Sequence, residues 1–123
     1  IKSVLKINKS KNNDKKLLIL GLAYKKNVDD LRESASLKLI NNLNKFKVKY
    51  DFSDPYIKNS VVTRNLVLRK KGIKINPSNL KKFDLVVLMT DHDSFNYKMI
   101  YKHSNKIIDC RGRYQIDNKV IRA

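Results

Sequence analysis

The sequence predicts an α/β fold of three layers, in which helices flank both faces of a mainly parallel sheet. Apolar segments of strand length alternate with segments of helical periodicity along the chain. The segment at residues 17–22 is continuously apolar, which is typical of a strand buried on both faces. The length of 123 residues fits one domain and is enough to bury a substantial core.

The first half of the chain contains two predicted strands and one helix. Residues 17–22 form a continuous apolar run and predict the first strand. Residues 36–46 place apolar side chains at helical spacing, and Asp30 with Glu33 is one of several possible caps for that helix. Residues 48–52 predict a second strand, which ends at a turn signal containing Asp and Pro.

The middle of the chain has a less regular pattern. Residues 57–71 are compatible with either a helix or a strand. A turn at Gly72 precedes a short predicted strand at residues 73–75, and a Pro-Ser pair then begins a short helix at residues 77–82.

The C-terminal part returns to clear signals. Residues 84–90 form a strongly apolar strand segment. A helical spacing follows at residues 95–103, and residues 106–110 predict a fourth core strand. Residues 112–123 are expected to add one more short strand.

Polar residues follow four of the predicted strands. In parallel sheets, ligands bind outside the carboxyl ends of the strands, so these positions are the candidate site. The four segments are residues 23–26, 53–56, 90–93 and 111–113.

Two of these strand ends contain groups with possible catalytic chemistry. Asp91, His92 and Asp93 could form a carboxylate–histidine base. We favour the simpler interpretation, in which Asp91 caps the next helix and His92 packs at the sheet edge. Cys110 is interpreted as a small buried hydrophobe rather than a nucleophile, and no metal site is expected.

The composition limits the functional classes. Lys and Arg total 28 against 11 acidic residues, a net charge of +17 that suggests a polyanion partner. However, 22 of the 28 are lysines dispersed along the chain, so a nucleic-acid-binding module remains only the alternative. A single cysteine fits a cytoplasmic setting, and no apolar run reaches membrane length. Three glycines cannot form a G-x-G-x-x-G or P-loop nucleotide cradle.

Four ordered motifs resemble one family. Residues 19–26, followed by Asp29-Asp30-Leu31-Arg32-Glu33-Ser34, resemble the start of the C-terminal, UDP-binding domain of the UDP-glucose/GDP-mannose dehydrogenase family. Asp54-Pro55-Tyr56, Thr90-Asp91-His92 and Ile108-Asp109-Cys110-Arg111 match later motifs in the same order. The resemblance covers residues 16–113 and implies a Rossmann-like domain.

The resemblance also implies roles for particular residues. Tyr24, Lys25 and Arg111 match positions that contact the UDP-sugar, and Arg32 matches an arginine that reaches toward NAD. Family members oxidise the C6 alcohol of a nucleotide sugar to a carboxylate with NAD. UDP-N-acetylglucosamine or UDP-glucose is the expected substrate, and UDP-N-acetylmannosamine is a further alternative. Ala35 departs from the proline that many members have there.

The same resemblance divides the chain and implies partners. Residues 1–16 would be the end of a central helix and a connector, and residues 17–123 the UDP-binding domain. NAD would be bound mainly by an N-terminal domain of the same enzyme, which is expected to be a homodimer. The catalytic cysteine motif is absent from these 123 residues, so they should lack turnover alone.

Overall fold

The computed structural model describes residues 16–22, 35–57, 61–62, 67–68 and 71–122. A five-stranded sheet forms the middle layer, and every neighbouring pair of its strands is parallel. This confirms the predicted fold class. The strands, in spatial order, are β2 (Lys49–Ser53), β1 (Lys16–Leu20), β5 (Leu85–Leu88), β6 (Ile107–Asp109) and β7 (Val120–Arg122).

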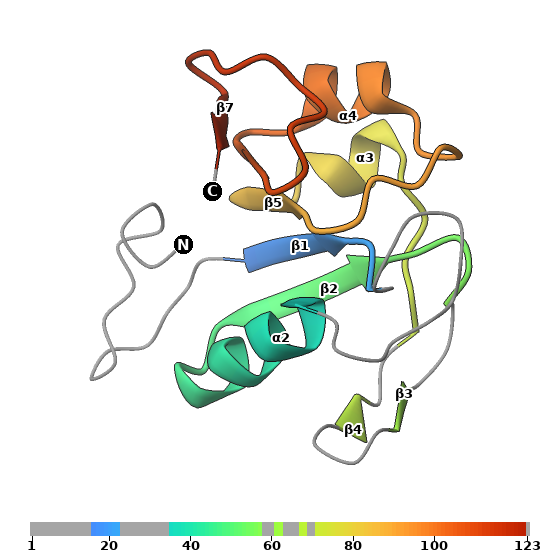
Figure 1. The fold of residues 1–123 in the computed structure, drawn as a ribbon, viewed down its shortest axis with the longest axis vertical. Coiled ribbons are helices and arrows are strands. Elements are labelled where there is room, and N and C mark those ends of the chain that lie inside the picture. Colours follow the sequence, from blue (N-terminus) through green and yellow to red (C-terminus); the bar gives the residue numbers. More distant parts are fainter. Residues whose placement is uncertain (1–15, 23–34, 58–60, 63–66, 69–70, 123) are drawn as a thin grey trace.

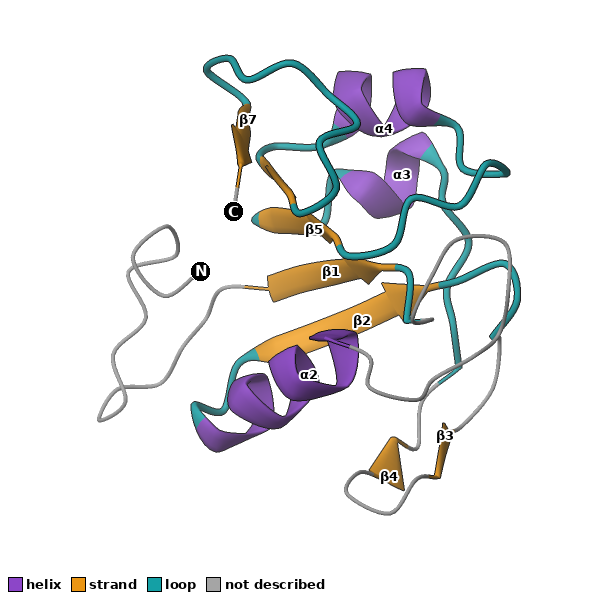
Figure 2. Ribbon diagram, viewed as in Figure 1, coloured by secondary structure: helices purple, strands orange, loops and turns teal. Residues whose placement is uncertain are grey.

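Helices cover both faces of the sheet (Figures 1 and 2). Helix α2 (Ala35–Lys45) lies on one face, and the short helices α3 (Pro77–Leu80) and α4 (Tyr97–His103) lie on the other. None of the helices in the described part of the chain has the length and apolar character of a membrane span.

Strand β1 divides its side chains between two hydrophobic clusters. Leu17 and Ile19 belong to the cluster that includes Ile40 of α2. Leu18 and Leu20 belong to the cluster that includes Ile100 of α4. These four apolar side chains are fully buried, because successive side chains of a strand point to opposite faces and both faces are covered.

Two predictions in the middle of the chain need correction or completion. The stretch that the sequence left open between helix and strand contains β3 (Val61–Val62) and β4 (Val67–Leu68), an antiparallel pair. The strand expected at residues 73–75 is wrong, because residues 71–76 have no regular structure. Ile73 N donates to Phe52 O at 2.9 Å, but the carbonyl of Lys74 accepts from the Asn79 side chain at 2.8 Å instead of a strand.

The cap expected for the last helix is also wrong. Asn96, and not Asp91, is the N-cap residue of α4, and its Oδ1 accepts a hydrogen bond from Met99 N at 3.1 Å. Asp91 lies six residues before the helix begins, too far to cap its first turn. The capping box of Asp30 and Glu33 lies outside the described residues.

A close contact fixes the end of β1. Gly21 has φ of +89°, and a Cβ added to it would lie 2.4 Å from Thr90 Cβ and 2.8 Å from Thr90 N. Gly112 has φ of +74°, but its nearest neighbour would be Arg122 at 3.7 Å. Both glycines occupy the left-handed region, whereas only Gly21 is also crowded by backbone.

We therefore predict that Gly21→Ala lowers the free energy of unfolding by at least about 2 kcal/mol, because backbone strain and overpacking add. Gly112→Ala, the matched control, should cost about 1 kcal/mol from the backbone conformation alone. Chemical denaturation of both variants measures the difference. Equal losses would show that the contact with Thr90 has no energetic weight.

Candidate functional site

The carboxyl ends of β1, β2, β5 and β6 lie at one edge of the sheet, because these four strands are parallel neighbours. Two of the four loops that the sequence selected, residues 53–56 and 90–93, contact each other at this edge. The loop at residues 111–113 contacts β5 and the residues that follow it. Residues 23–26 lie outside the described residues.

Asp54 connects three of these strand ends. Its Oδ2 accepts a hydrogen bond from Leu22 N at 2.8 Å, just after β1, and its Oδ1 accepts one from Tyr56 N at 2.8 Å. His92 Nε2 lies 3.0 Å from the same Oδ2. An ionised carboxylate only accepts, so in this pair the hydrogen bond requires the tautomer with its proton on Nε2. One carboxylate thereby fixes the ends of β1 and β2 and the loop after β5.

His92 is fixed on its other sides as well. Its side chain is fully buried, and its ring lies 4.9 Å from the ring of Tyr56 and 5.5 Å from that of Phe95, between centroids. The Tyr97 hydroxyl donates to the His92 carbonyl at 2.6 Å. The expectation that His92 packs at the sheet edge is confirmed. Its carboxylate partner in this bond is Asp54, whereas the sequence suggested the adjacent Asp91 and Asp93. The sequence did not predict the pairing of His92 with Asp54.

The aromatic contacts continue beyond His92. Each ring of this aromatic row lies within 6.1 Å of the next, between centroids. The row links the turn after β2 with α4 and with the segment after β6. Its members, in spatial order, are Tyr56, His92, Phe95, Tyr97, Tyr114 and Tyr101.

A second buried aspartate organises the loop after β6. Asp109 Oδ1 accepts hydrogen bonds from Arg111 N and Gly112 N, both at 2.9 Å, and its Oδ2 accepts one from Tyr114 N at 2.7 Å. Arg111 is exposed, and its Nε donates to Met89 O at 2.8 Å at the end of β5. Arg111 is therefore held at the carboxyl edge, where the sequence predicted a ligand contact.

Arg113 links the same loop to the loop after β5. Its guanidinium carbon lies 4.2 Å from the centre of the Tyr97 ring. Its Nη1 lies 4.0 Å from carboxylate oxygens of both Asp91 and Asp93. These two acids therefore interact with a cation of the neighbouring loop. Sequence reasoning could not anticipate this, because 20 residues separate Arg113 from Asp93.

Cys110 has the environment of a packed side chain. It is half-buried against the cluster under α2, and its Sγ lies 3.6 Å from Met89 Sδ. Burial, and after it the charge of Asp109, raises the pKa of the Cys110 thiol. Because the thiolate is the nucleophile, this environment disfavours covalent catalysis. Among the described residues, no group of three or more His, Cys, Asp or Glu side chains could hold a metal ion.

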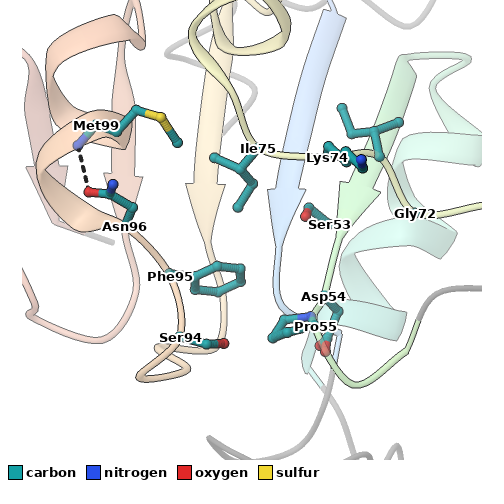
Figure 3. A pocket seen from close by; sticks show the side chains of 11 residues that line it. Ser53, Asp54, Pro55, Gly72, Lys74, Ile75, Ser94, Phe95, Asn96 and Met99 are labelled. Carbon is teal, nitrogen blue, oxygen red and sulfur yellow. Dashed lines mark hydrogen bonds between the residues drawn. The ribbon is translucent and has the colours of Figure 1, made fainter.

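A cavity of about 420 Å³ opens beside Asp54. Figure 3 shows Phe95 extending from the loop before α4 towards Asp54 and Pro55. The remaining wall comes from residues 72–75, where Lys74 supplies a cation, and from α4. An apolar cavity with a few polar groups at this edge suits a small organic ligand.

The other predicted site residues fall outside the described part of the chain. These are Tyr24, Lys25 and Arg32, together with the acidic pair Asp29 and Asp30. Of residues 1–16, expected to be the end of a central helix and a connector, residues 1–15 also lie outside it, and Lys16 begins β1. What the structure fixes is the residue that leads into them: Leu22, held by Asp54, lies two residues before Tyr24.

Because the phenol of Tyr97 is half-buried, we expect the stability of the domain to depend on pH in the alkaline range. Burial raises its pKa from 10.0 to about 12. Unfolding therefore releases a proton between these values, so the folded state loses stability as pH rises from 10 to 12. Tyr97→Phe should cost about 1 kcal/mol at pH 8, through the lost bond to His92. That difference should shrink towards pH 12; denaturation that shows a constant difference would contradict the prediction.

Comparison with known proteins shows which family this chain resembles. The UDP-glucose/GDP-mannose dehydrogenase family model of the UDP binding domain matches residues 18–116. A curated relative, the UDP-glucose 6-dehydrogenase of Caenorhabditis elegans, is 31% identical over an alignment of 124 positions, which covers 89% of this chain and 25% of the relative. The chain spans about a quarter of the length of this relative.

Two solved structures are similar over 98% of this chain. The UDP-D-ManNAc dehydrogenase of Pyrococcus horikoshii is 25% identical, with a TM-score of 0.67 over 27% of its own chain. The UDP-N-acetyl-mannosamine dehydrogenase of Staphylococcus aureus is 24% identical, with a TM-score of 0.58 over 27% of its chain, and supports the fold alone. Because the family model spans the four strand ends described above, this chain belongs to the UDP-glucose/GDP-mannose dehydrogenase family, as its UDP binding domain.

Proposed function

We propose that this chain binds the UDP portion of a UDP-sugar and serves an NAD-dependent dehydrogenase that oxidises the sugar C6 alcohol to a carboxylate. One observation supports this most directly: the family match over residues 18–116 includes every residue proposed for the ligand. The relatives are named as dehydrogenases of UDP-sugars, which agrees with this reaction class.

The residues proposed to contact UDP follow two strands of the sheet, β1 and β6, in the sequence. Tyr24 and Lys25 follow β1 directly, and Arg111 lies two strands away at the end of β6. A lysine ammonium and an arginine guanidinium suit the pyrophosphate and base of UDP, and an aromatic ring offers a stacking face. We therefore propose that UDP binds at the carboxyl ends of β1, β5 and β6.

The described glycines do not fit an NAD cradle. Gly21 is crowded by Thr90 and follows β1 without the second and third glycines of a dinucleotide loop. We therefore derive no hydride-transfer step on this chain. We propose that an N-terminal domain of the whole protein holds NAD, and that Arg32 reaches toward it. A cytoplasmic homodimer is part of the same proposal.

The choice of sugar is also a proposal. We propose UDP-N-acetylglucosamine or UDP-glucose as the substrate of the whole protein. The solved relatives are named for UDP-N-acetylmannosamine, and the curated relative for UDP-glucose. All of these share UDP, so UDP is the probe that tests the domain.

NMR titration of the chain with UDP is expected to shift the amides of residues 22–32 and 110–113. Lys25→Ala and Arg111→Ala should each weaken binding about tenfold or more, since each removes a charge-assisted contact. Lys98→Ala is the matched control, because Lys98 is an exposed lysine on α4, and its UDP affinity should be unchanged.

Two outcomes would count against UDP binding. One is an unperturbed spectrum at millimolar UDP. The other is an equal loss of affinity in Lys98→Ala, which would indicate a general effect of positive charge. Binding of duplex DNA is measured alongside as the test of the alternative function. Binding to DNA through net charge alone would fall steeply as salt rises.

A further inference from the structure

The residue after β1 has little freedom of direction. Gly21 N donates to Ser53 O at 2.9 Å, and Leu22 N donates to Asp54 Oδ2 at 2.8 Å. Thr90, in the loop after the neighbouring strand β5, lies against Gly21. Contacts with β2 and with the loops after β2 and β5 therefore fix the direction of the backbone at Gly21 and Leu22.

The carboxylate that receives Leu22 is itself held by a buried side chain. The Asp54 and His92 side chains are both fully buried, and the aromatic row confines the imidazole between Tyr56 and Phe95. A buried ionic or polar pair is costly to desolvate, and apolar side chains could fill the same space at less cost. We therefore interpret the pair as fixing the orientation of the backbone at Leu22 rather than as a source of stability.

We infer that Asp54 and His92 are positioning residues for UDP binding, which fix the direction of the backbone at Leu22, two residues before the first residue proposed to contact UDP. This inference rests on the proposed function. His92 orients the Asp54 carboxylate, Asp54 orients Leu22, and the ligand residues follow two and three positions later. Neither residue needs to touch the ligand, because they act through the backbone of β1.

The test compares four variants by calorimetric titration with UDP. Asp54→Asn loses an acceptor oxygen, and His92→Phe keeps an aromatic ring but loses the donor. Both should weaken UDP binding about tenfold, as expected for a lost hydrogen bond to a charged group. His92→Gln retains an N–H donor and should bind within about threefold of the unmodified chain. A merely structural effect of repacking would not be rescued by glutamine.

Asp84→Asn is the matched control. Asp84 Oδ2 accepts a hydrogen bond from Lys16 N at 2.8 Å, the same kind of bond at the opposite end of β1. Its UDP affinity should remain that of the unmodified chain. Unchanged affinity in both Asp54→Asn and His92→Phe, or an equal loss in Asp84→Asn, would overturn the inference.

A second readout separates this inference from the proposed function. Without UDP, Asp54→Asn and His92→Phe should shift the amide resonances of residues 22–26, whereas Asp84→Asn should not. If the unmodified chain fails to bind UDP, the proposed function fails, and the amide shifts still decide whether the pair positions this segment. If Asp54→Asn does not fold, the Phe and Gln variants of His92 give the answer alone.

Discussion

The complete burial of the four apolar residues of β1 is the constraint on which the rest of this domain depends. The strand has a parallel partner along each edge and a hydrophobic cluster on each face, so Leu17, Leu18, Ile19 and Leu20 have no exposed surface. Because β1 is parallel to both of its neighbours, the three strands end at the same side of the sheet. The loops that follow these strands therefore meet there, and their polar groups have to be paired with one another.

Two buried aspartates satisfy that requirement in the same way. Asp54 accepts backbone N–H groups from the ends of β1 and β2, and Asp109 accepts three from the loop after β6. Each replaces the hydrogen bonds that the backbone loses when the strands end. Both carboxylates are buried, and Asp91 and Asp93 lie beside Arg113 at the same carboxyl edge.

Sequence reasoning succeeded where burial alone determines structure. The apolar segment at residues 17–22 overlaps β1, the segment at residues 84–90 contains β5, and the parallel arrangement follows from their lack of alternation. It failed where side chains replace regular pairing. The alternation of Ile73 and Ile75 imitates a strand, but the Asn79 side chain takes the carbonyl between them. The bond of Asp54 to His92 spans 38 residues, and only the topology of the sheet brings the two together. The roles of Tyr24, Lys25 and Arg32 rest on the family resemblance, because those residues lie beyond the described part of the chain.

The aromatic row also gives this edge of the sheet an optical signature. The chain contains no tryptophan, so its near-ultraviolet absorption comes mainly from six tyrosines, four of which belong to the row. Closely spaced aromatic rings in fixed orientations are the source of near-ultraviolet circular dichroism, which disappears when tertiary packing is lost. The dichroism of this chain is therefore weighted towards the carboxyl edge, and it reports on the packing around His92 without any added label.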